Sequence, residues 1–463
     1  MTSYFDGADA SRILREYPIG EDFLNGPAKL SRDELRNLQE QRFQTVMRRA
    51  WDVAFYQSLW GDKGIEPGDI RGLDDIAKLP SFSKSDLMAS IEKSPPFGDY
   101  HGVDFADPAN RPHVVFHTTS GTTGRPQPLF FGAWDREVQN VLLARTYRLQ
   151  GIRDDDVMHS VYGFGMVNGG HYVREGVLHF TKAVLLTAGT GLETRSEQQV
   201  ALMRDFGVTA VVGFVDYIKR LAEVALENGI VPGRDIPVRL ICGHMGQESR
   251  EQISEAWGGA DVFDWYGVGD TGAIAAEGPE QDGLYLWEDA QFVEIIDADT
   301  HDSVPDGEAG NICCTCLFKH TVYPVIRFNT NDVTRIVPGH NGSGINFRRI
   351  EGFRGRSDNM VKLRGVNVYP TSVGAALLGI DALTGEFICR LDREGTRDEM
   401  TVIIEAKEGV ARDDLLADRV AALLRQKLGV QVSVELVGPG ETAPLTEVER
   451  RQKAIRLIDT RFK

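Results

Sequence analysis

Residues 118–124 combine side chains and spacing that can hold an anion. They read Thr-Thr-Ser-Gly-Thr-Thr-Gly, so hydroxyl groups and two glycines fill one short segment. Glycine permits positive φ angles that turn successive backbone N–H groups toward one point, and Thr and Ser hydroxyls donate further hydrogen bonds. The segment is therefore a candidate phosphate-binding loop. Clusters of Gly, Ser, Thr and Pro also form ordinary solvated turns, and that interpretation stays open here.

The elements around this loop exclude one familiar class of nucleotide site. Apolar residues at 113–116 and at 129–131 predict a strand on each side of the loop. A Walker loop instead joins a strand to a helix and ends in Gly-Lys-Ser/Thr, which is missing here. Nucleotide binding at this loop therefore requires another family.

Composition limits the functions that the chain can have. With 463 residues, 42% of them hydrophobic, we expect two to four domains of about 100–200 residues each. The net charge of −17 without a Lys/Arg-rich block argues against nucleic acid or an anionic membrane as a partner. The first residues lack a basic start and an apolar run, so we predict a cytoplasmic location. Five cysteines do not form the even set typical of a secreted disulfide framework.

Hydrophobic periodicity predicts an α/β architecture. A helix over 31–51 begins with a capping box of Ser31 and Glu34, and residues 134–149 predict an amphipathic helix. Further strands are predicted at 157–161, 183–187, 210–213 and 238–242, with helices at 196–206 and 215–228. We therefore expect a sheet covered by helices.

The later part of the chain changes character twice. Strands at 292–296, 310–318 and 333–337, broken by Asp-Gly and Pro-Gly turns, predict a β-rich subdomain. Beyond residues 356–358, the segments 387–391, 400–405, 412–428 and 430–436 predict a small β-β-α-β domain. We therefore expect a large N-terminal domain, residues 1–357, and a small α+β C-terminal domain, residues 358–463.

Four further motifs accompany the loop. They are Tyr266-Gly-Val-Gly-Asp-Thr-Gly272, Arg327-Phe-Asn-Thr-Asn-Asp332, the run from Gly355-Arg-Ser-Asp358 to Tyr369-Pro370, and Gln452-Lys453-Ala-Ile-Arg456. Together with the loop they resemble the adenylate-forming superfamily, and Trp287-Glu-Asp289 adds a resemblance to its phenylacetate–coenzyme A ligase branch. The resemblance covers the chain from about His113 onward.

The resemblance implies a two-step reaction. A carboxylate is first joined to the α-phosphate of ATP, with loss of pyrophosphate, and the thiol of coenzyme A then displaces AMP. Because two anions must meet, oriented donors, cations and Mg²⁺ are required.

The same resemblance implies a role for individual residues. The β- and γ-phosphates would be enclosed by the loop residues Thr118, Thr119, Ser120, Gly121, Thr122, Thr123 and Gly124. Further nucleotide contacts would come from Gly243, His244, Tyr266, Gly267, Thr271, Asp332 and Arg356. The Asp332 carboxylate would accept hydrogen bonds from both ribose hydroxyls.

Two positions depart from the family pattern. Gln127 stands where a lysine is usual, which removes a cation, and Asp270 stands where a glutamate usually contacts Mg²⁺. The shorter Asp270 side chain favours an intervening water. Lys453 would neutralise the reacting oxygens during adenylation, and the C-terminal domain would rotate about a hinge at Asp358.

The acid pocket and the cysteines leave alternatives open. Glycine clearance beside aromatic faces predicts an aromatic or arylacetic acid, held by Tyr162, Phe164, Gly165, His171 and Phe214. His171 and His244 would contact a polar substituent or serve as hydrogen-bonded structural histidines. Cys314 and Cys316 share one face of a strand and could bind zinc with Cys242 or His244, or all could be buried free cysteines.

We therefore predict an AMP-forming aryl- or arylacetate–coenzyme A ligase with Lys453, Asp270 and Arg356 as catalytic residues. One alternative is an adenylase that passes the acyl group to an amine or a carrier protein. Another is a non-catalytic nucleotide-binding protein, if the changes at Gln127 and Asp270 disable the chemistry. A homodimer is expected from the general frequency of two-fold symmetry.

Overall fold

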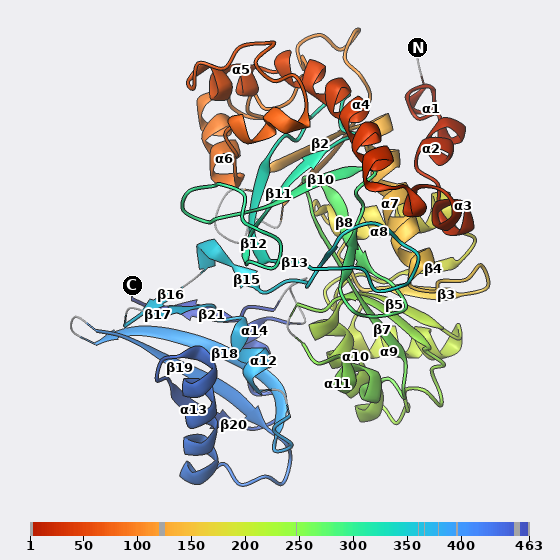
Figure 1. The fold of residues 1–463 in the computed structure, drawn as a ribbon. Helices are drawn as coiled ribbons and strands as arrows, with labels where there is room; N and C mark the ends of the chain where they lie inside the picture. Colours follow the sequence, from red (N-terminus) through yellow and green to blue (C-terminus); the bar gives the residue numbers. More distant parts are fainter. Residues whose placement is uncertain are drawn as a thin grey trace. The chain divides into compact units, whose positions relative to one another are not determined.

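The computed structural model describes residues 3–119, 126–246, 248–359, 361–364, 366–377, 379–394, 397–448 and 454–461 (Figure 1). The chain forms two compact units. Unit 1 contains Met1–Thr187 and Phe263–Gly352, and unit 2 contains Ala188–Val262 and Phe353–Lys463. The α/β class is confirmed. The predicted domain boundary at residue 358 divides the chain differently and stays a prediction.

Unit 1 begins with a series of short helices and one long helix. The long helix α4 starts at a reciprocal capping box, in which the Ser31 hydroxyl accepts from the Glu34 N–H and the Glu34 carboxylate accepts from the Ser31 N–H at 2.9 Å. The helices of this region are α1 (Tyr4–Gly7), α2 (Ala10–Glu16), α3 (Gly20–Asn25), α4 (Arg32–Trp51), α5 (Ala54–Gly61) and α6 (Lys84–Lys93).

A two-stranded hairpin and a buried helix follow. Strands β1 (Val114–Thr118) and β2 (Pro128–Gly132) pair antiparallel and confirm the strand-loop-strand prediction. Helix α7 (Ala133–Leu149) is not amphipathic as predicted, because every residue from Ala133 to Tyr147 is buried. Its buried charges have partners instead: the Arg145 guanidinium binds both carboxylate oxygens of Asp289 at 2.8 and 3.1 Å.

The rest of unit 1 consists of strands and helix α8 (Asn168–Phe180). Strands β3 (Val157–Ser160) and β4 (Val184–Thr187) pair in parallel. The other strands pair antiparallel in two groups. The first group is β7 (Asp261–Val268), β8 (Gly272–Glu277), β9 (Leu284–Leu286), β14 (Arg349–Ile350) and β13 (Ile336–Val337); the second is β10 (Gln291–Ile296), β11 (Gly310–Cys316) and β12 (Phe328–Thr334).

Unit 2 combines a parallel strand pair with the C-terminal sheet. Strands β5 (Ala210–Phe214) and β6 (Leu240–His244) pair in parallel, with helices α9 (Ser196–Asp205), α10 (Val215–Glu227) and α11 (Arg250–Ala256) in the same segment. The C-terminal sheet has the order β20-β19-β18-β21. Its long hairpin, β18 (Leu383–Glu394) and β19 (Arg397–Ala406), is followed by α13 (Asp414–Leu428), β20 (Ser433–Val437) and β21 (Leu457–Asp459). Four short elements precede the hairpin: β15 (Gly355–Arg356), β16 (Val361–Leu363), β17 (Val366–Val368) and α12 (Ser372–Leu377). The short helix α14 (Ala443–Thr446) lies between β20 and β21 in the chain.

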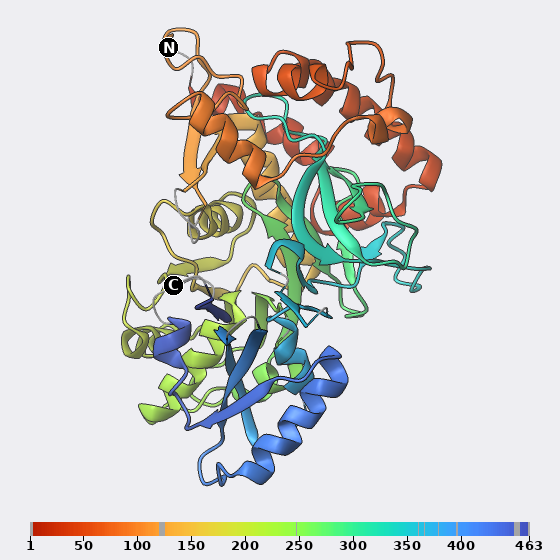
Figure 2. The same cartoon turned by 90° about the vertical axis from the view of Figure 1, so that its left-hand side faces the viewer.

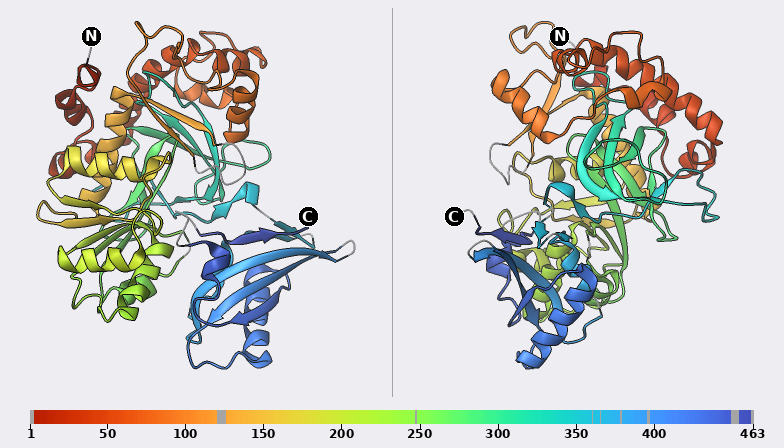
Figure 3. Two further views of the ribbon diagram at one scale, coloured as in Figure 1. Left: turned by 180° about the vertical axis from the view of Figure 1, so that it is seen from behind. Right: turned by 60° about the vertical axis from the view of Figure 1, so that its left-hand side comes forward.

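Helix α13 lies along one face of the β18–β19 ribbon (Figure 2), and the strong curvature of the hairpin is visible from behind (Figure 3). The helix contributes Val420 and Leu424 to a core shared with β18 and β19. This confirms the predicted β-β-α-β arrangement.

Candidate active site

The base of the predicted phosphate loop is closed by backbone hydrogen bonds in unit 1. The Thr119 N–H donates to the Gln127 carbonyl at 3.0 Å, and the Gln127 N–H donates to the Thr119 hydroxyl at 3.1 Å. The Thr118 N–H donates to the Met166 carbonyl at 2.8 Å. The two ends of the loop are therefore held together. The predicted contacts Ser120, Gly121, Thr122, Thr123 and Gly124 lie outside the described residues.

The two residues that depart from the family pattern contact each other. The side-chain amide of Gln127 donates to Asp270 Oδ1 at 2.7 Å, and the Tyr323 hydroxyl donates to the same oxygen at 3.1 Å. Asp270 lies in the turn between β7 and β8 and is 4% exposed. Burial raises the pKa of Asp270, although the nearby Lys319 ammonium and the two hydrogen bonds act in the opposite direction.

A buried lysine completes this group. Lys319 Nζ donates to the Asp270 backbone carbonyl at 2.8 Å and lies 4.2 Å from the ring centroid of Tyr323 and 5.2 Å from that of Phe131. The side chain is fully buried, and burial lowers the pKa of Lys319. Within the described part of the chain, no carboxylate forms an ion pair with it. No sequence motif marks this residue, and its local signal is a single lysine directly after the apolar residues Leu317 and Phe318.

The turn that carries Lys319 is attached to helix α7 by one carboxylate. Asp135 Oδ1 accepts from the backbone N–H of His320 at 3.2 Å, and Oδ2 accepts from the Thr321 hydroxyl at 2.6 Å and from the Val322 N–H at 3.3 Å. Asp135 is fully buried. We refer to Gln127, Asp270, Lys319 and Tyr323 as the loop-base group.

Four of the predicted nucleotide contacts lie in unit 1, and they are Tyr266, Gly267, Thr271 and Asp332. The Tyr266 hydroxyl donates to Asp332 Oδ2 at 2.7 Å, and the Asp332 N–H donates to the Thr330 hydroxyl at 3.1 Å. Asn331 beside it has a left-handed φ of 60°, which asparagine tolerates better than most residues. The geometry explains Gly267, because a Cβ there would lie 2.4 Å from the Gly272 carbonyl oxygen. Thr271 is buried, and its hydroxyl donates to that carbonyl at 3.0 Å.

Most of the predicted acid-pocket residues also belong to unit 1. His171 Nε2 lies 2.9 Å from the Phe164 carbonyl oxygen and 3.0 Å from that of Gly165, so this histidine has hydrogen-bond partners. Its ring stacks on that of His117 with the centroids 4.8 Å apart, and Tyr162 is buried. His117 is buried, and its Nε2 has no hydrogen-bond partner among the described residues. Burial, then the Arg136 charge, lower the pKa of His117 to about 4.

The other predicted site residues lie in unit 2. Strand pairing sets Gly213 opposite Gly243 and Phe214 opposite His244, and the last two rings stack with centroids 5.0 Å apart. Arg356 binds Asp358 through two hydrogen bonds of 2.8 and 2.6 Å. Lys453 lies outside the described residues.

The structure does not support the predicted zinc site. Cys314 Sγ lies 3.2 Å from Gln291 Oε1, and burial raises the pKa of this thiol, which disfavours the thiolate that zinc requires. Among the described residues, the one group of three or more closely spaced metal-type ligands consists of carboxylates: Asp216, Glu248 and Glu386. None of the predicted candidates Cys242, His244, Cys314 and Cys316 belongs to it.

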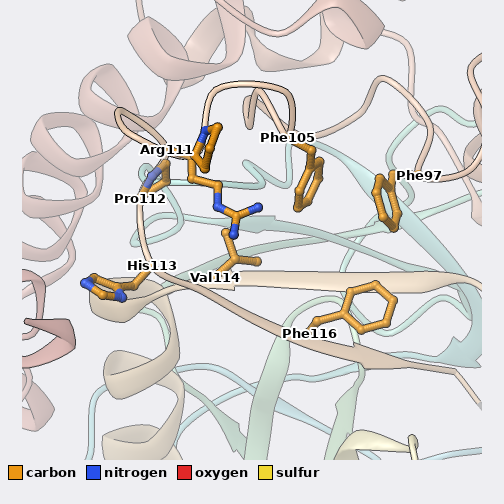
Figure 4. Close-up of a pocket in the computed structure, with 8 residues that line it drawn as sticks. Phe97, Phe105, Arg111, Pro112, His113, Val114 and Phe116 are labelled. Carbon is orange, nitrogen blue, oxygen red and sulfur yellow. The ribbon is translucent and has the colours of Figure 1, made fainter.

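A separate cavity lies beside strand β1. It has a volume of about 520 Å³, and Figure 4 shows three phenylalanine rings on one side of it with Arg111 beside them. Its lining includes none of the predicted acid-pocket residues and consists of Phe97, Phe105, Pro108, Arg111, Pro112, His113, Val114 and Phe116.

Comparisons with known proteins bear on the whole chain. Residues 365–461 match the family model described as the AMP-binding enzyme C-terminal domain. The phenylacetate–coenzyme A ligase of Aromatoleum evansii is 31% identical over 446 residues, covering 94% of this chain and 96% of that protein. The ligase of the same name from Thermus thermophilus is 30% identical, covering 92% and 98%.

A solved 2-hydroxyisobutyryl-CoA ligase in the postadenylation state with 2-HIB-AMP is 28% identical, with a TM-score of 0.82 and coverage of 94% and 91%. The same ligase in the thioesterification state, with 2-HIB-AMP and CoA, gives a TM-score of 0.66. Among the helices built from described residues, none has the length and apolar character needed to cross a membrane.

Proposed function

Because the chain belongs to the adenylate-forming superfamily, in its phenylacetate–coenzyme A ligase-like branch, it is an AMP-forming acid–coenzyme A ligase, and we propose that its acid is aromatic or arylacetic. ATP activates the carboxylate as an acyl-adenylate, and coenzyme A then takes the acyl group. The relatives named phenylacetate–coenzyme A ligase support an arylacetate.

The observation that carries the acid class is the aromatic surround in unit 1. The Phe164 ring meets the His171 ring edge-on at 5.5 Å, and His171 stacks on His117. A further flat apolar ring can pack favourably against such rings in an offset or edge-on arrangement. We therefore assign Phe164 and His171 to the wall of the acid pocket, with Tyr162 and Gly165 beside them. The role of Phe214, which belongs to unit 2, stays a prediction.

Hydrogen bonds of unit 1 support the proposed nucleotide contacts. The Asp332 carboxylate, held by Tyr266, would accept from the ribose hydroxyls. Asp270 Oδ1 already accepts two hydrogen bonds, and Oδ2 remains for a hard cation that prefers oxygen. When bound, Mg²⁺ would neutralise phosphate charge there. The Lys319 ammonium fixes the Asp270 backbone and adds positive charge to the same region.

One observation favours a second acid class. His117 Nε2 is a buried polar atom without a described partner, and buried polar atoms are normally satisfied. A hydroxyl on the acid would supply that partner. A small hydroxy acid, such as the one that the related 2-hydroxyisobutyryl-CoA ligase is named for, is therefore the second candidate.

The test is acid-dependent exchange of labelled pyrophosphate into ATP, followed by coenzyme A-dependent release of AMP. The panel contains phenylacetate, benzoate, a hydroxylated analogue of each, and 2-hydroxyisobutyrate. We expect the arylacetates to give the highest kcat/KM. If 2-hydroxyisobutyrate exceeds every aromatic acid, the aromatic class is wrong. Addition of EDTA should stop exchange, and excess Mg²⁺ should restore it.

The role proposed for Lys453 has its own test. Lys453→Ala should abolish pyrophosphate exchange while a supplied acyl-adenylate still reacts with coenzyme A, because the first step alone needs that cation. Equal loss of both half-reactions would contradict the assignment. Rotation of residues 358–463 about Asp358, a homodimer and a cytoplasmic location remain predictions.

A further inference from the structure

Five charged side chains form a cluster inside unit 2. They belong to Asp216, Lys219, Glu248, Glu386 and Arg456, and the exposed fraction of each side chain lies between 10% and 20%. Charges are rarely buried to this degree unless they are paired. We refer to these five residues as the charge cluster.

Two cations hold the three carboxylates together. Lys219 Nζ donates to Glu248 Oε2 at 2.8 Å and to Glu386 Oε1 at 2.7 Å. The Arg456 guanidinium donates to Glu386 Oε2 at 3.0 Å, to Glu248 Oε1 at 3.1 Å and to Asp216 Oδ1. It also donates to the Phe387 carbonyl at 2.9 Å and lies over the Phe387 ring.

This arrangement argues against a metal site, although three carboxylate oxygens lie within 4.8 Å of one another. The ammonium and the guanidinium occupy the positions between those oxygens. Although burial alone raises the pKa of Glu386, Lys219 and Arg456 lower it to about 2. The two cations therefore already supply the counter-charge that a metal would bring.

The cluster ties together two chain segments that are far apart in sequence. Asp216 and Lys219 lie on α10, and Glu248 follows β6. Glu386 lies on β18, and Arg456 directly precedes β21. Three of the five bonds join residues 216–248 to residues 386–456, and they are Lys219–Glu386, Arg456–Asp216 and Arg456–Glu248. The other two bonds lie within one segment each.

Arg456 is also close in sequence to the predicted catalytic lysine. Three residues of fully extended chain span at most about 11 Å, so fixing Arg456 limits the region that residue 453 can reach. The solved 2-hydroxyisobutyryl-CoA ligase is known in a postadenylation and a thioesterification state, so a relative of this fold changes form between the two half-reactions.

We propose that Lys219, Glu386 and Arg456 are positioning residues for adenylation: the charge cluster holds the segment leading into β21 in the form that makes the acyl-adenylate, and its bonds between the two segments open before thioester formation. This inference rests on the proposed function. It assigns to these residues an effect on one half-reaction and not on the other.

The test uses the full-length double variant Lys219→Met/Glu386→Gln. The cluster has three carboxylates and two cations, and the double variant keeps two carboxylates and one cation, so its net charge stays at −1. We expect pyrophosphate exchange to fall by about tenfold or more, since small misplacement of a catalytic group costs up to about 10²-fold. Reaction of a supplied acyl-adenylate with coenzyme A should stay within about twofold of wild type, because the cluster is open in that step.

A matched control is Arg461→Met. Arg461 Nη1 donates to Asp398 at 2.8 Å and Nη2 to Asp459 at 2.7 Å, and both of these carboxylates lie on strands of the C-terminal sheet. Both half-reactions of this variant should change by the same factor. Equal loss of both half-reactions in Lys219→Met/Glu386→Gln, or no loss of exchange, overturns the positioning role. Absence of exchange in the wild-type protein with every acid tested would instead overturn the proposed function.

Discussion

The loop-base group of unit 1 buries a cation that has no ion-pair partner in the described chain, whereas the charge cluster of unit 2 buries its charges in ion pairs. Lys319 is fully buried and binds a backbone carbonyl and two aromatic rings, with no carboxylate partner in the described chain. In the charge cluster, Lys219 and Arg456 each bind at least two carboxylates. Burial raises the pKa of Asp270, whereas the cations lower that of Glu386; within the charge cluster, burial also raises the pKa of Glu248.

The comparison separates a buried cation without an ion-pair partner in the described chain from buried charges that connect two chain segments through ion pairs. An uncompensated buried charge destabilises the protein, and such charges concentrate at functional sites. A cluster of buried ion pairs is strongly destabilised when one partner is removed. Removing a charge should therefore increase stability in the loop-base group and decrease it in the charge cluster.

The largest effect is expected for Arg456→Met. It leaves three buried carboxylates with one cation and should lower the free energy of unfolding by about 3–5 kcal/mol. Urea denaturation at pH 7 measures this, with Arg461→Met as the control that loses less. Because the pKa of Glu386 is lowered to about 2 from its usual 4.5, its contribution is present above pH 4.5 and disappears as the pH falls toward 2. The two proteins should therefore converge in acid, and a constant difference would contradict the pairing.

Asp270→Asn should separate activity from stability. We expect pyrophosphate exchange to fall by about 100-fold or more, because a carboxylate at the phosphate site is lost. The melting temperature should nevertheless rise at pH 7. Because the pKa of Asp270 is raised in the folded protein, the wild type loses stability as the pH rises above 3.8 and this carboxyl ionises. The difference in melting temperature between wild type and variant should therefore vanish below pH 3.8, the pKa of this group in the unfolded chain.

The control for Asp270→Asn is Asp135→Asn, which alters a buried carboxylate that accepts several hydrogen bonds. It should destabilise the protein by roughly 1–3 kcal/mol. If both variants lose stability, the distinction between the two carboxylates fails.

Lys319→Met should lower exchange by about tenfold and raise the KM for Mg-ATP, because a charge near the phosphates is lost. Its thermal stability at pH 7 should equal or exceed that of wild type. Burial lowers the pKa of Lys319, so wild-type stability gains a contribution as the pH rises toward 10.5, and the variant should lack this gain. Melting curves between pH 7 and 10 check the slope, and an unchanged slope would show that Lys319 is not the group involved.

The smallest effect is expected for Gln127→Lys, which makes the loop-base group more like the charge cluster. The new ammonium would pair with Asp270, which Gln127 now binds at 2.7 Å. Stability should rise by roughly 1–2 kcal/mol. The Mg²⁺ concentration for half-maximal rate should also increase, since the cation competes for the same carboxylate. Titration of Mg²⁺ in the exchange assay measures this, and a decreased requirement would argue against a metal contact at Asp270.

Local patterns predicted most of the fold. The strands on both sides of the loop, helices α9 and α10, and the C-terminal β-β-α-β order all follow from hydrophobic periodicity. The sequence predicted a strand at residues 333–337, but β12 begins at Phe328. The prediction was wrong because β12 continues through polar residues, which include the proposed ribose contact.

Helix α8 was missed for a packing reason. It begins with Asn168 and two glycines, which are poor helix formers. Tertiary contact overrides this preference: a Cβ on Gly176 would lie 3.2 Å from the Asn140 carbonyl of α7, so glycine permits the close approach of the two helices.

The site was predicted unevenly. The pairs Tyr266–Asp332 and Gln127–Asp270 join residues that sequence motifs had singled out. Lys319 and, apart from Arg456, the residues of the charge cluster belong to no motif described above, and the bonds of Lys319, Lys219 and Arg456 reach residues between 29 and 240 positions away along the chain. Contacts of that separation have no local signature, so the three-dimensional structure was needed to find them.

The burial of α7 on every side has a consequence for synthesis on the ribosome. This helix emerges early, yet Asp135 binds His320, 185 positions later. A nascent chain that ends before that turn cannot cover the helix and leaves apolar surface open to aggregation. Translation intermediates of this length should therefore be the ones that chaperones retain, and their release should coincide with the appearance of the last strands of unit 1.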